Sequence, residues 1–444
     1  MPRKRLFPPV DPTTGQRLEN KGRADFTVLT VNGRITLWRR RWSSPTTGSV
    51  TPLDALLDLA EARLTVGVRE LACRLNQASR NFDKAAENLA RAAQVVLSGE
   101  LLRQVVEAEG KAVLHAQQAG TLVLGWTAAD CRVPPPADAA AVPSAAAAAV
   151  PPTAAVATTP PPASAAATAP PVVADTRVYL GSDGVKVPLI TAVEKQRRRQ
   201  KVKQKRRRRG RKCRPLPKAK PGADQRYKEF KIVTYYDETQ DHRHVSVTQG
   251  DHEVAGKRMR RDAGRIRLDR AEDKVAIVDG APWIRNQIEG QSLPIDVIEL
   301  DFYHLSDNVH KARRAVYGED APAGQEWAAQ VLHTAKHEGY AALRDALVAW
   351  KGTLRGSKKR QAAETLLGYV TDRREMVAYP EYQAAGRQIG SGPTESMCKT
   401  TTARLKGSGM RWDADNAEAI MALDALEQSG EWKQYWKMRL RPVA

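Results

Sequence analysis

A run of alanine and proline, residues 132–174, is the feature that most constrains how this chain can fold. Its repeated prolines stop the alanines from forming a long helix, and the run holds too few large apolar side chains to make a core. The sequence therefore predicts a linker over residues 127–175, which separates an N-terminal region, residues 1–126, from a larger C-terminal part. At 444 residues the chain is long enough for two or three domains.

The N-terminal region is predicted to be a β-hairpin followed by helices. Residues 26–42 contain two alternating runs around Asn32 and Gly33, a dipeptide typical of a tight hairpin turn. Residues 81–114 fit two helices separated by a short turn, and Ser98 can cap the second helix. This spacing is that of a helix-turn-helix in a mainly α-helical DNA-binding region, and it is also that of an ordinary helical hairpin.

Positive charge is concentrated in one segment. The chain has 71 lysine and arginine residues against 50 acidic residues, a formal net charge of +21. Residues 195–214 carry fourteen basic residues and no acid. Such a run repels itself, so it predicts an extended or disordered arm whose partner is a polyanion, above all nucleic acid. A membrane surface fits less well, because no apolar face accompanies the charges.

Cysteine usage and hydropathy exclude other classes of protein. The four cysteines are far apart and form no C-x-x-C pair, which argues against a structural zinc site and against a disulfide framework. The first residues contain no apolar signal segment, and no run of about eighteen apolar residues exists. We therefore expect a cytoplasmic protein with no membrane partner.

The C-terminal part alternates strand and helix patterns. Strands dominate from residue 176, interrupted by the basic arm at residues 195–220, and helices dominate from about residue 325. Gly392 and Pro393 mark the start of a final helix, with proline at its first position. This order predicts an α/β catalytic domain, residues 176–309 and 386–444, with an all-α insertion, residues 310–385.

Three acids of this domain share a pattern. Asp183 follows a strand, Asp279 ends the strand of residues 274–278, and Glu395 lies in the first turn of the final helix. Each has a simpler explanation, because Asp-Gly favours a turn and a helix N-terminus favours an acid. If the three converge on one pocket, their oxygens suit Mg²⁺ or Mn²⁺, and two such ions support phosphodiester cleavage.

Five phrases, in order along the chain, carry a family resemblance: GSDGVKV, VDGAPWI, ELDFYHLSDNVHKA, YPEYQAAGRQIGSGPTESMCK and RLKGSGMRW. They resemble bacterial insertion-sequence DDE transposases of the ISKra type, over roughly residues 177–436. The resemblance implies a ribonuclease-H-like catalytic fold with an α-helical insertion before the last acid. It also implies DNA cleavage at transposon ends, joining of the 3′-hydroxyl to target DNA, and Mg²⁺ or Mn²⁺ as cofactor.

Carried over residue by residue, the resemblance makes Asp183, Asp279 and Glu395 the metal-binding catalytic triad. The family's DFYH element matches residues 301–304, so His304 is a candidate catalytic residue and Asp301 a candidate auxiliary acid. Both can equally be residues that hold the insertion. The basic residues predicted to contact DNA are Arg197, Arg198, Arg199, Lys201, Lys203, Lys205, Arg206, Arg207, Arg208, Arg209, Lys399 and Arg404.

The N-terminal region departs from the family. Relatives usually carry cysteine pairs there that form a small zinc module, whereas residues 39–57 hold no cysteine, so zinc is not predicted. The preferred interpretation is a transposase that works as a homo-oligomer on element ends and target DNA in the bacterial nucleoid. The alternatives are a non-catalytic DNA-binding protein derived from a transposase, and a ribonuclease-H-like nuclease such as a junction resolvase, which cleaves without joining.

Overall fold

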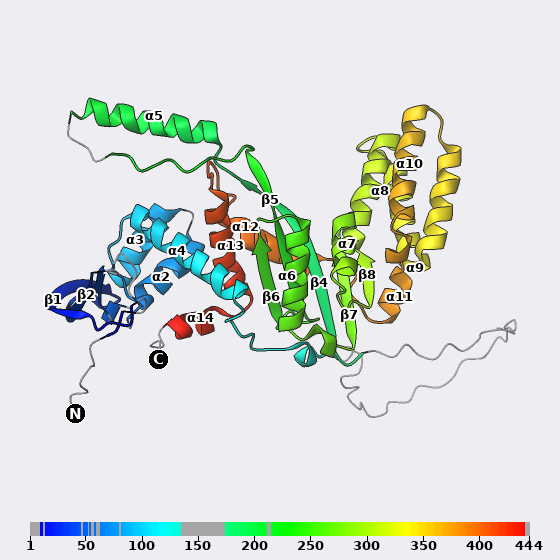
Figure 1. Cartoon of the computed structure of the whole chain (residues 1–444). Coiled ribbons are helices and arrows are strands. Elements are labelled where there is room, and N and C mark those ends of the chain that lie inside the picture. Colours follow the sequence, from blue (N-terminus) through cyan, green and yellow to red (C-terminus); the bar gives the residue numbers. More distant parts are fainter. Residues whose placement is uncertain are drawn as a thin grey trace, which may run out of the picture.

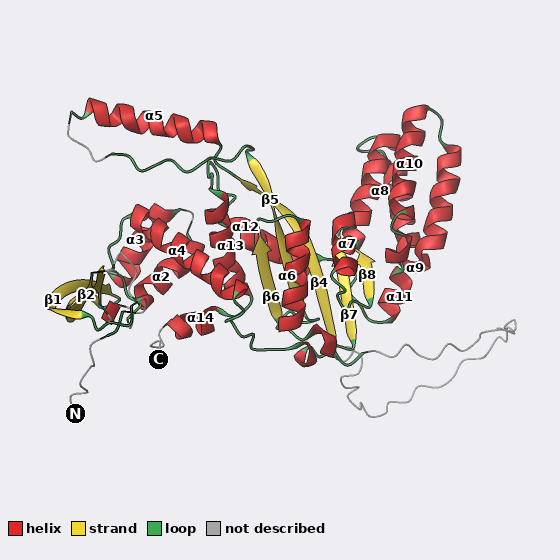
Figure 2. Cartoon of the chain, viewed as in Figure 1, coloured by secondary structure: helices red, strands yellow, loops and turns green. Residues whose placement is uncertain are grey.

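The computed structural model describes residues 9–11, 14–45, 48–51, 53–54, 57–58, 63–79, 81–134, 174–210 and 215–439. Its centre is a mixed sheet with helices on both faces (Figure 1, Figure 2). Within these ranges, five strands form the sheet in the order β6-β5-β4-β7-β8. They are β4 (Arg177–Pro188), β5 (Tyr227–Tyr236), β6 (Arg243–Thr248), β7 (Asp273–Val278) and β8 (Val297–Leu300).

Strand β4 lies in the middle of the sheet. On one side β4, β5 and β6 pair antiparallel, and on the other side β4, β7 and β8 pair parallel. Parallel neighbours need crossover helices, and these are α6 (His252–Arg265), followed by the short turn η3 (Leu268–Arg270), and α7 (Pro282–Gly290). Tyr179 joins the apolar core on one face, while Val178 and Leu180 join the core on the other. The predicted mixed α/β fold is confirmed.

Helices from the C-terminal end of the chain cover one face of the sheet, and helices from the N-terminal region pack against them. From the C-terminal end come α12 (Gly392–Ala403), α13 (Ala414–Gln428) and α14 (Trp432–Arg439). From the N-terminal region come α2 (Val66–Gln77), α3 (Phe82–Ala93) and α4 (Gly99–Gln118), and α4 packs along α13 (Figure 1). One apolar core joins α2–α4, α12–α14 and this face of the sheet.

The N-terminal hairpin has the expected turn. Its strands are β1 (Glu19–Thr30) and β2 (Gly33–Ser44), followed by β3 (Gly48–Val50). Thr30 pairs with Gly33, whose φ of +105° glycine adopts without strain. The predicted Ser98 cap of α4 is also confirmed, since the Ser98 side chain accepts from the N–H of Leu101 at 3.1 Å.

The helix pair α3–α4 does not offer a free basic face. The Arg103 guanidinium donates to the carboxylates of both Glu100 and Glu107. The opposite side of α4 buries Leu102, Val105 and other apolar residues. A DNA-reading role for this pair stays a prediction.

The helical insertion stands beyond β7 and β8, away from the N-terminal helices (Figure 1). Its helices are α8 (Phe302–Tyr317), α9 (Pro322–Thr353), α10 (Ser357–Thr371) and α11 (Tyr379–Ala384), with the short turn η4 (Arg374–Met376). The indole rings of Trp327 and Trp350 stack at 4.0 Å within α9, which departs from helical geometry at Gly339. Among the helices that the structure describes, none has the length and apolarity needed to span a membrane.

The described residues on either side of the alanine–proline segment lie next to one another. The Val133 N–H donates to the Asp175 carbonyl at 3.0 Å, and Arg132 forms a β-bridge with Thr176. The chain therefore leaves and re-enters the fold at one place. Residues 135–173, most of the predicted linker, lie outside the described residues. The two parts of the chain that this segment joins share one apolar core, and the role of residues 127–175 as a linker stays a prediction.

The basic arm is a helix over most of its length. Residues Ala192–Arg208 form α5, which begins with a capping box in which Thr191 and Glu194 each accept from the other's N–H. The helix buries none of its residues and projects from the edge of the fold (Figure 1). Our expectation of an extended or disordered arm was wrong for these residues, because the cap and the helix-favouring Lys, Arg and Gln side chains outweigh the charge repulsion. Residues 211–214 lie outside the described residues.

Gly110 tests the contact between α4 and α13. A methyl group at this position would overlap the Ala419 carbonyl, whereas one at the exposed Gly368 of α10 would meet nothing within 4 Å. We expect Gly110→Ala to lower the free energy of unfolding by about 1–3 kcal/mol through overpacking. The control Gly368→Ala should raise it by about 0.5–1 kcal/mol, because alanine favours a helix. Urea unfolding checks both, and equal effects would contradict the close contact.

Candidate active site

Asp183 and Asp279 lie at the same level of the sheet. In the parallel pair β4–β7, Leu180 is opposite Ala276, and three further steps of that register bring Asp183 opposite Asp279. Neighbouring strands are about 4.8 Å apart, and residues opposite one another point to the same face. The register thus places two carboxylates side by side.

The sequence favoured a turn at Asp183, but in the structure this residue lies within a strand. Strand β4 is continuous from Arg177–Pro188, and Asp183 pairs with Ile232 in the middle of it. The Asp183 Oδ1 accepts from the Gly184 N–H at 2.6 Å. The local turn preference of Asp-Gly is overridden because Asp183 and Gly184 pair with Ile232 and Lys231 of β5.

Asp279 both makes a turn and faces a pocket. Its Oδ1 accepts from the Ala281 N–H at 2.8 Å, and Gly280 follows with φ +81°. A side chain at Gly280 would also overlap Arg373, whose Nε donates to the Gly280 carbonyl at 3.0 Å. The turn therefore fixes the direction of the Asp279 carboxylate, and the helical insertion supports the turn.

Glu395 reaches this level because α12 lies directly on β4. Gly181 has no side chain, and any Cβ there would overlap Thr394, the residue before Glu395. The Thr394 hydroxyl lies 3.1 Å from that of Thr234 on β5, which donates to the Gly181 carbonyl at 3.2 Å. Sequence reasoning missed this contact; the glycine two residues before Asp183, on the same face of the strand, was the available signal.

Asp301 positions two neighbouring elements. It is fully buried, caps α8 by accepting from the Tyr303 N–H at 2.7 Å, and accepts from both the N–H and the hydroxyl of Ser391. Ser391 precedes α12, while His304 lies in the first turn of α8. One buried carboxylate thus fixes the starts of both helices, so these contacts favour the positioning role for Asp301 that the sequence left open.

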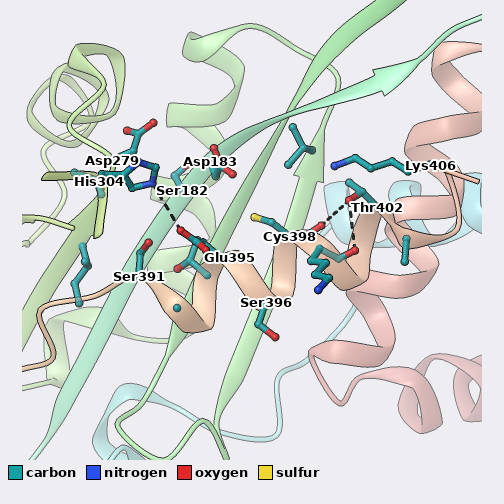
Figure 3. Close-up of a pocket in the computed structure, with 17 residues that line it drawn as sticks. Ser182, Asp183, Asp279, His304, Ser391, Glu395, Ser396, Cys398, Thr402 and Lys406 are labelled. Carbon is teal, nitrogen blue, oxygen red and sulfur yellow. Dashed lines mark hydrogen bonds and ion pairs between the residues drawn. The ribbon is translucent and has the colours of Figure 1, made fainter. Parts of the chain in front are cut away.

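One pocket of about 750 Å³ is lined by Asp183, Asp279, His304, Ser391 and Glu395. Figure 3 shows Asp183, Asp279 and His304 above the start of α12, with Glu395 directed toward His304. The His304 Nε2 lies 3.8 Å from the Glu395 Oε1. The remaining charged residues of the wall, Lys399 and Lys406, are exposed side chains. The pocket therefore combines carboxylates, an imidazole and two ammonium groups.

The carboxylates repel one another in the absence of a cation. Burial raises the pKa of Asp183 above its ordinary value, and the nearby charge of Asp279 raises it further. A divalent cation with oxygen ligands would relieve both effects, so the residues fit Mg²⁺ or Mn²⁺. Ligand atoms of Asp301, His304 and Glu395 already lie within 4.8 Å of one another, whereas Asp183, Asp279 and Glu395 share the pocket without forming so close a group.

The predicted DNA contacts divide into two groups. Lys399 is exposed at the pocket, and the basic side chains of α5 are on its surface. Arg404, in contrast, is only 6% exposed: its guanidinium donates to Asn76 and lies over the rings of Phe82 and Trp412. Arg404 thus ties the end of α12 to the N-terminal helices, and these contacts favour a structural role for it over contact with DNA phosphates.

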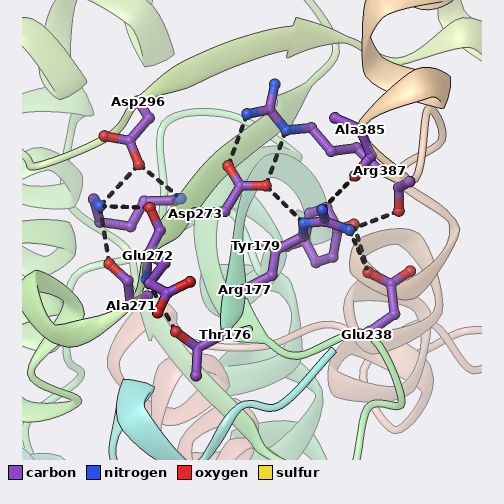
Figure 4. Close-up of polar contacts among 12 residues, drawn as sticks. Thr176, Arg177, Tyr179, Glu238, Ala271, Glu272, Asp273, Asp296, Ala385 and Arg387 are labelled. Atoms are coloured by element: carbon purple, nitrogen blue, oxygen red, sulfur yellow. Dashed lines mark hydrogen bonds and ion pairs between the residues drawn. The ribbon is translucent and has the colours of Figure 1, made fainter. Parts of the chain in front are cut away.

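A polar network fixes the chain that leads back from the insertion to α12 (Figure 4). Asp273, at the start of β7, accepts from Arg177 at 2.7 Å and from Arg387 at 2.8 and 3.0 Å. Arg177 also donates to the carbonyls of Ala385 and Gly386. These bonds attach the segment before α12 to the start of β4 and β7, so the pocket is built on a segment fixed at both ends.

Comparison with known proteins gives little more. No family model matches the chain, and no curated protein matches it. Among solved structures, the chain is similar to one described as a Drosophila P element transposase strand transfer complex. The similarity covers 87% of each chain at 9% identity, with a TM-score of 0.27. A similarity at this level carries no argument about fold or function.

The buried carboxyl of Glu299 in β8 should make the stability of the protein depend on pH. It is fully buried beside the network, with Arg387 Nη1 at 3.9 Å, and burial raises its pKa to about 8. The folded protein therefore keeps a proton that the unfolded carboxyl releases above its ordinary pKa of 4.5. As the pH rises from 4.5 to about 8, the free energy of unfolding should therefore decrease, by at most about 1.4 kcal/mol per pH unit from this group.

Glu299→Gln mimics the neutral acid, so we expect it to flatten this part of the stability curve. Urea unfolding at a series of pH values measures the slope. The exposed Glu326→Gln serves as the control and should keep the wild-type slope. Identical slopes in wild type and Glu299→Gln would show that the buried carboxyl is not protonated at neutral pH.

Proposed function

We propose that this protein is a DNA transposase that cleaves phosphodiester bonds at element ends and joins the 3′-hydroxyl to target DNA. The observation that carries the proposal is that three acids remote in sequence line one pocket: Asp183 on β4, Asp279 directly after β7 and Glu395 on α12. The sheet, with its antiparallel and parallel halves around β4, is compatible with a ribonuclease-H-like fold. The family phrases of the sequence support the same class.

The three carboxylates would hold Mg²⁺ or Mn²⁺. When bound, such ions activate the attacking oxygen and stabilise the leaving oxygen of the phosphodiester. Closing of the pocket around the cations would bring Glu395 toward the two aspartates, since catalytic geometry often tightens only in the complex. His304, half-buried beside Glu395, can hold a proton near the leaving oxygen or orient Glu395.

DNA would be bound by lysines and by the basic helix. Lys399 and Lys406 are exposed at the pocket, where they can pair with phosphates on either side of the scissile bond. Helix α5 offers cations on all sides and buries none of them, so it can follow a DNA backbone without reading its sequence. Two ends must be brought together for joining, so we expect a homo-oligomer to form on DNA.

Asp279→Asn tests the chemistry with little disturbance of the fold. The amide keeps an oxygen that can accept from the Ala281 N–H, and it removes the charge that a metal needs. With Mg²⁺ or Mn²⁺ and labelled duplexes from the DNA flanking its gene, wild type should cut and join strands. The variant should be at least about a hundredfold slower, because the metal supplies several kcal/mol. Gel analysis of cleaved and joined products measures both.

Asp307→Asn is the matched control, since Asp307 is exposed on α8 outside the pocket wall. It should retain wild-type cleavage and joining. Tight DNA binding without metal-dependent cutting by wild type would favour the non-catalytic DNA-binding alternative. Cutting without joining would favour a nuclease of the resolvase kind.

A further inference from the structure

A second group of side chains suited to a metal lies beside the start of β4, where the Arg177 N–H donates to the Cys131 carbonyl. Ligand atoms of Cys131, Asp237 and His242 all lie within 4.8 Å of one another. Cys131 directly follows the short turn η1 (Ala128–Asp130), while Asp237 and His242 flank the hairpin between β5 and β6. Cys131 is remote in sequence from the other two residues, which are five positions apart in one hairpin, so no spacing of cysteines or histidines could have indicated the group.

The hairpin holds the carboxylate and the imidazole in a fixed relation. The His242 Nδ1 lies 2.7 Å from one oxygen of Asp237, and the Asp237 N–H donates to the His242 carbonyl at 3.1 Å. The Trp126 ring lies against the imidazole, with ring centroids 5.5 Å apart. Two of the three ligands are therefore already oriented by contacts that do not involve the third.

Cys131 brings sulfur to this pair. Its side chain has no exposed surface, and the only hydrogen bond of its Sγ among the described residues is a long one to the Thr127 carbonyl at 3.8 Å. Backbone bonds fix its position, because the Cys131 carbonyl accepts from the Arg177 N–H at 2.9 Å. The buried sulfur is out of reach of a substrate, so its position beside Asp237 and His242 suits a ligand better than a nucleophile.

We propose that Cys131, Asp237 and His242 bind Zn²⁺. A thiolate, an imidazole and a carboxylate form a ligand set that zinc takes in tetrahedral sites, whereas Mg²⁺ and Ca²⁺ prefer oxygen alone. The His242 side chain is 31% exposed, which gives the ion a route of entry and leaves a fourth position for water.

The site would join parts of the chain that are remote in sequence. It ties the segment after α4 to the β5–β6 hairpin, beside the point where the alanine–proline segment leaves and re-enters the fold. Binding of zinc to the folded state alone adds to stability. This role does not depend on the carboxylate pocket or on any activity toward DNA.

Cobalt reports this site directly. Co²⁺ replaces Zn²⁺ in tetrahedral sites, and a cysteine ligand gives a thiolate-to-cobalt absorption band that carboxylate sites cannot produce. We expect one equivalent of Co²⁺ to produce this band in the reduced, metal-stripped full-length protein, and one equivalent of Zn²⁺ to abolish it. Cys131→Ser should lose the band. His242→Asn, at the half-exposed ligand, should fold normally and bind at least about tenfold more weakly.

Cys398 is the matched control, because this buried cysteine lines the carboxylate pocket. Cys398→Ser should keep the band and its stoichiometry. Zn²⁺ should also raise the melting temperature of the stripped wild type but not that of His242→Asn. A band lost in Cys398→Ser and kept in Cys131→Ser would overturn the proposal by placing the ion in the other pocket. Absence of the band in wild type would overturn it as well.

Discussion

The contact between Gly181 and Thr394 is the constraint on which the pocket depends. A helix can lie this close to a strand only where the strand lacks a side chain, and β4 has its glycine two residues before Asp183. Thr394 fills the space and pairs with the hydroxyl of Thr234 on β5. The next residue of the helix, Glu395, is thereby held at the level of Asp183. Any reaction that needs both acids therefore depends on the absence of a side chain at Gly181.

The other elements of the site are fixed at the two points where the helical insertion joins the sheet. Asp301 fixes the start of α8, where the insertion leaves the sheet, and through Ser391 the start of α12, where the chain returns. The network around Asp273 fixes the segment just before α12. With both ends attached to the sheet, the insertion can serve other purposes without moving the carboxylates. Arg373 links the two units by supporting the turn after Asp279.

Local signals in the sequence predicted turns and helix starts, whereas the features that the sequence did not predict depend on contacts between remote residues. The Asn32–Gly33 turn, the Ser98 cap and the start of α12 depend on neighbouring residues, so they were predictable. The continuity of β4 through Asp183 depends on pairing with β5, which overrides the local turn preference. The burial of Arg404 depends on the remote Asn76, Phe82 and Trp412. Cys131 likewise meets the hairpin residues Asp237 and His242 only through the fold.

The most direct test measures Mn²⁺ binding by the loss of the free-ion electron paramagnetic resonance signal. The account predicts that Gly181→Ala displaces α12 and weakens Mn²⁺ binding at least about tenfold. Thr394→Gly, introduced into the same chain, removes the closer of the two side chains that the new methyl overlaps, the other being that of Thr234, and should restore most of the affinity. Wild-type Mn²⁺ affinity in Gly181→Ala, or weakened binding that Thr394→Gly does not restore, would contradict the claim that this contact builds the metal site.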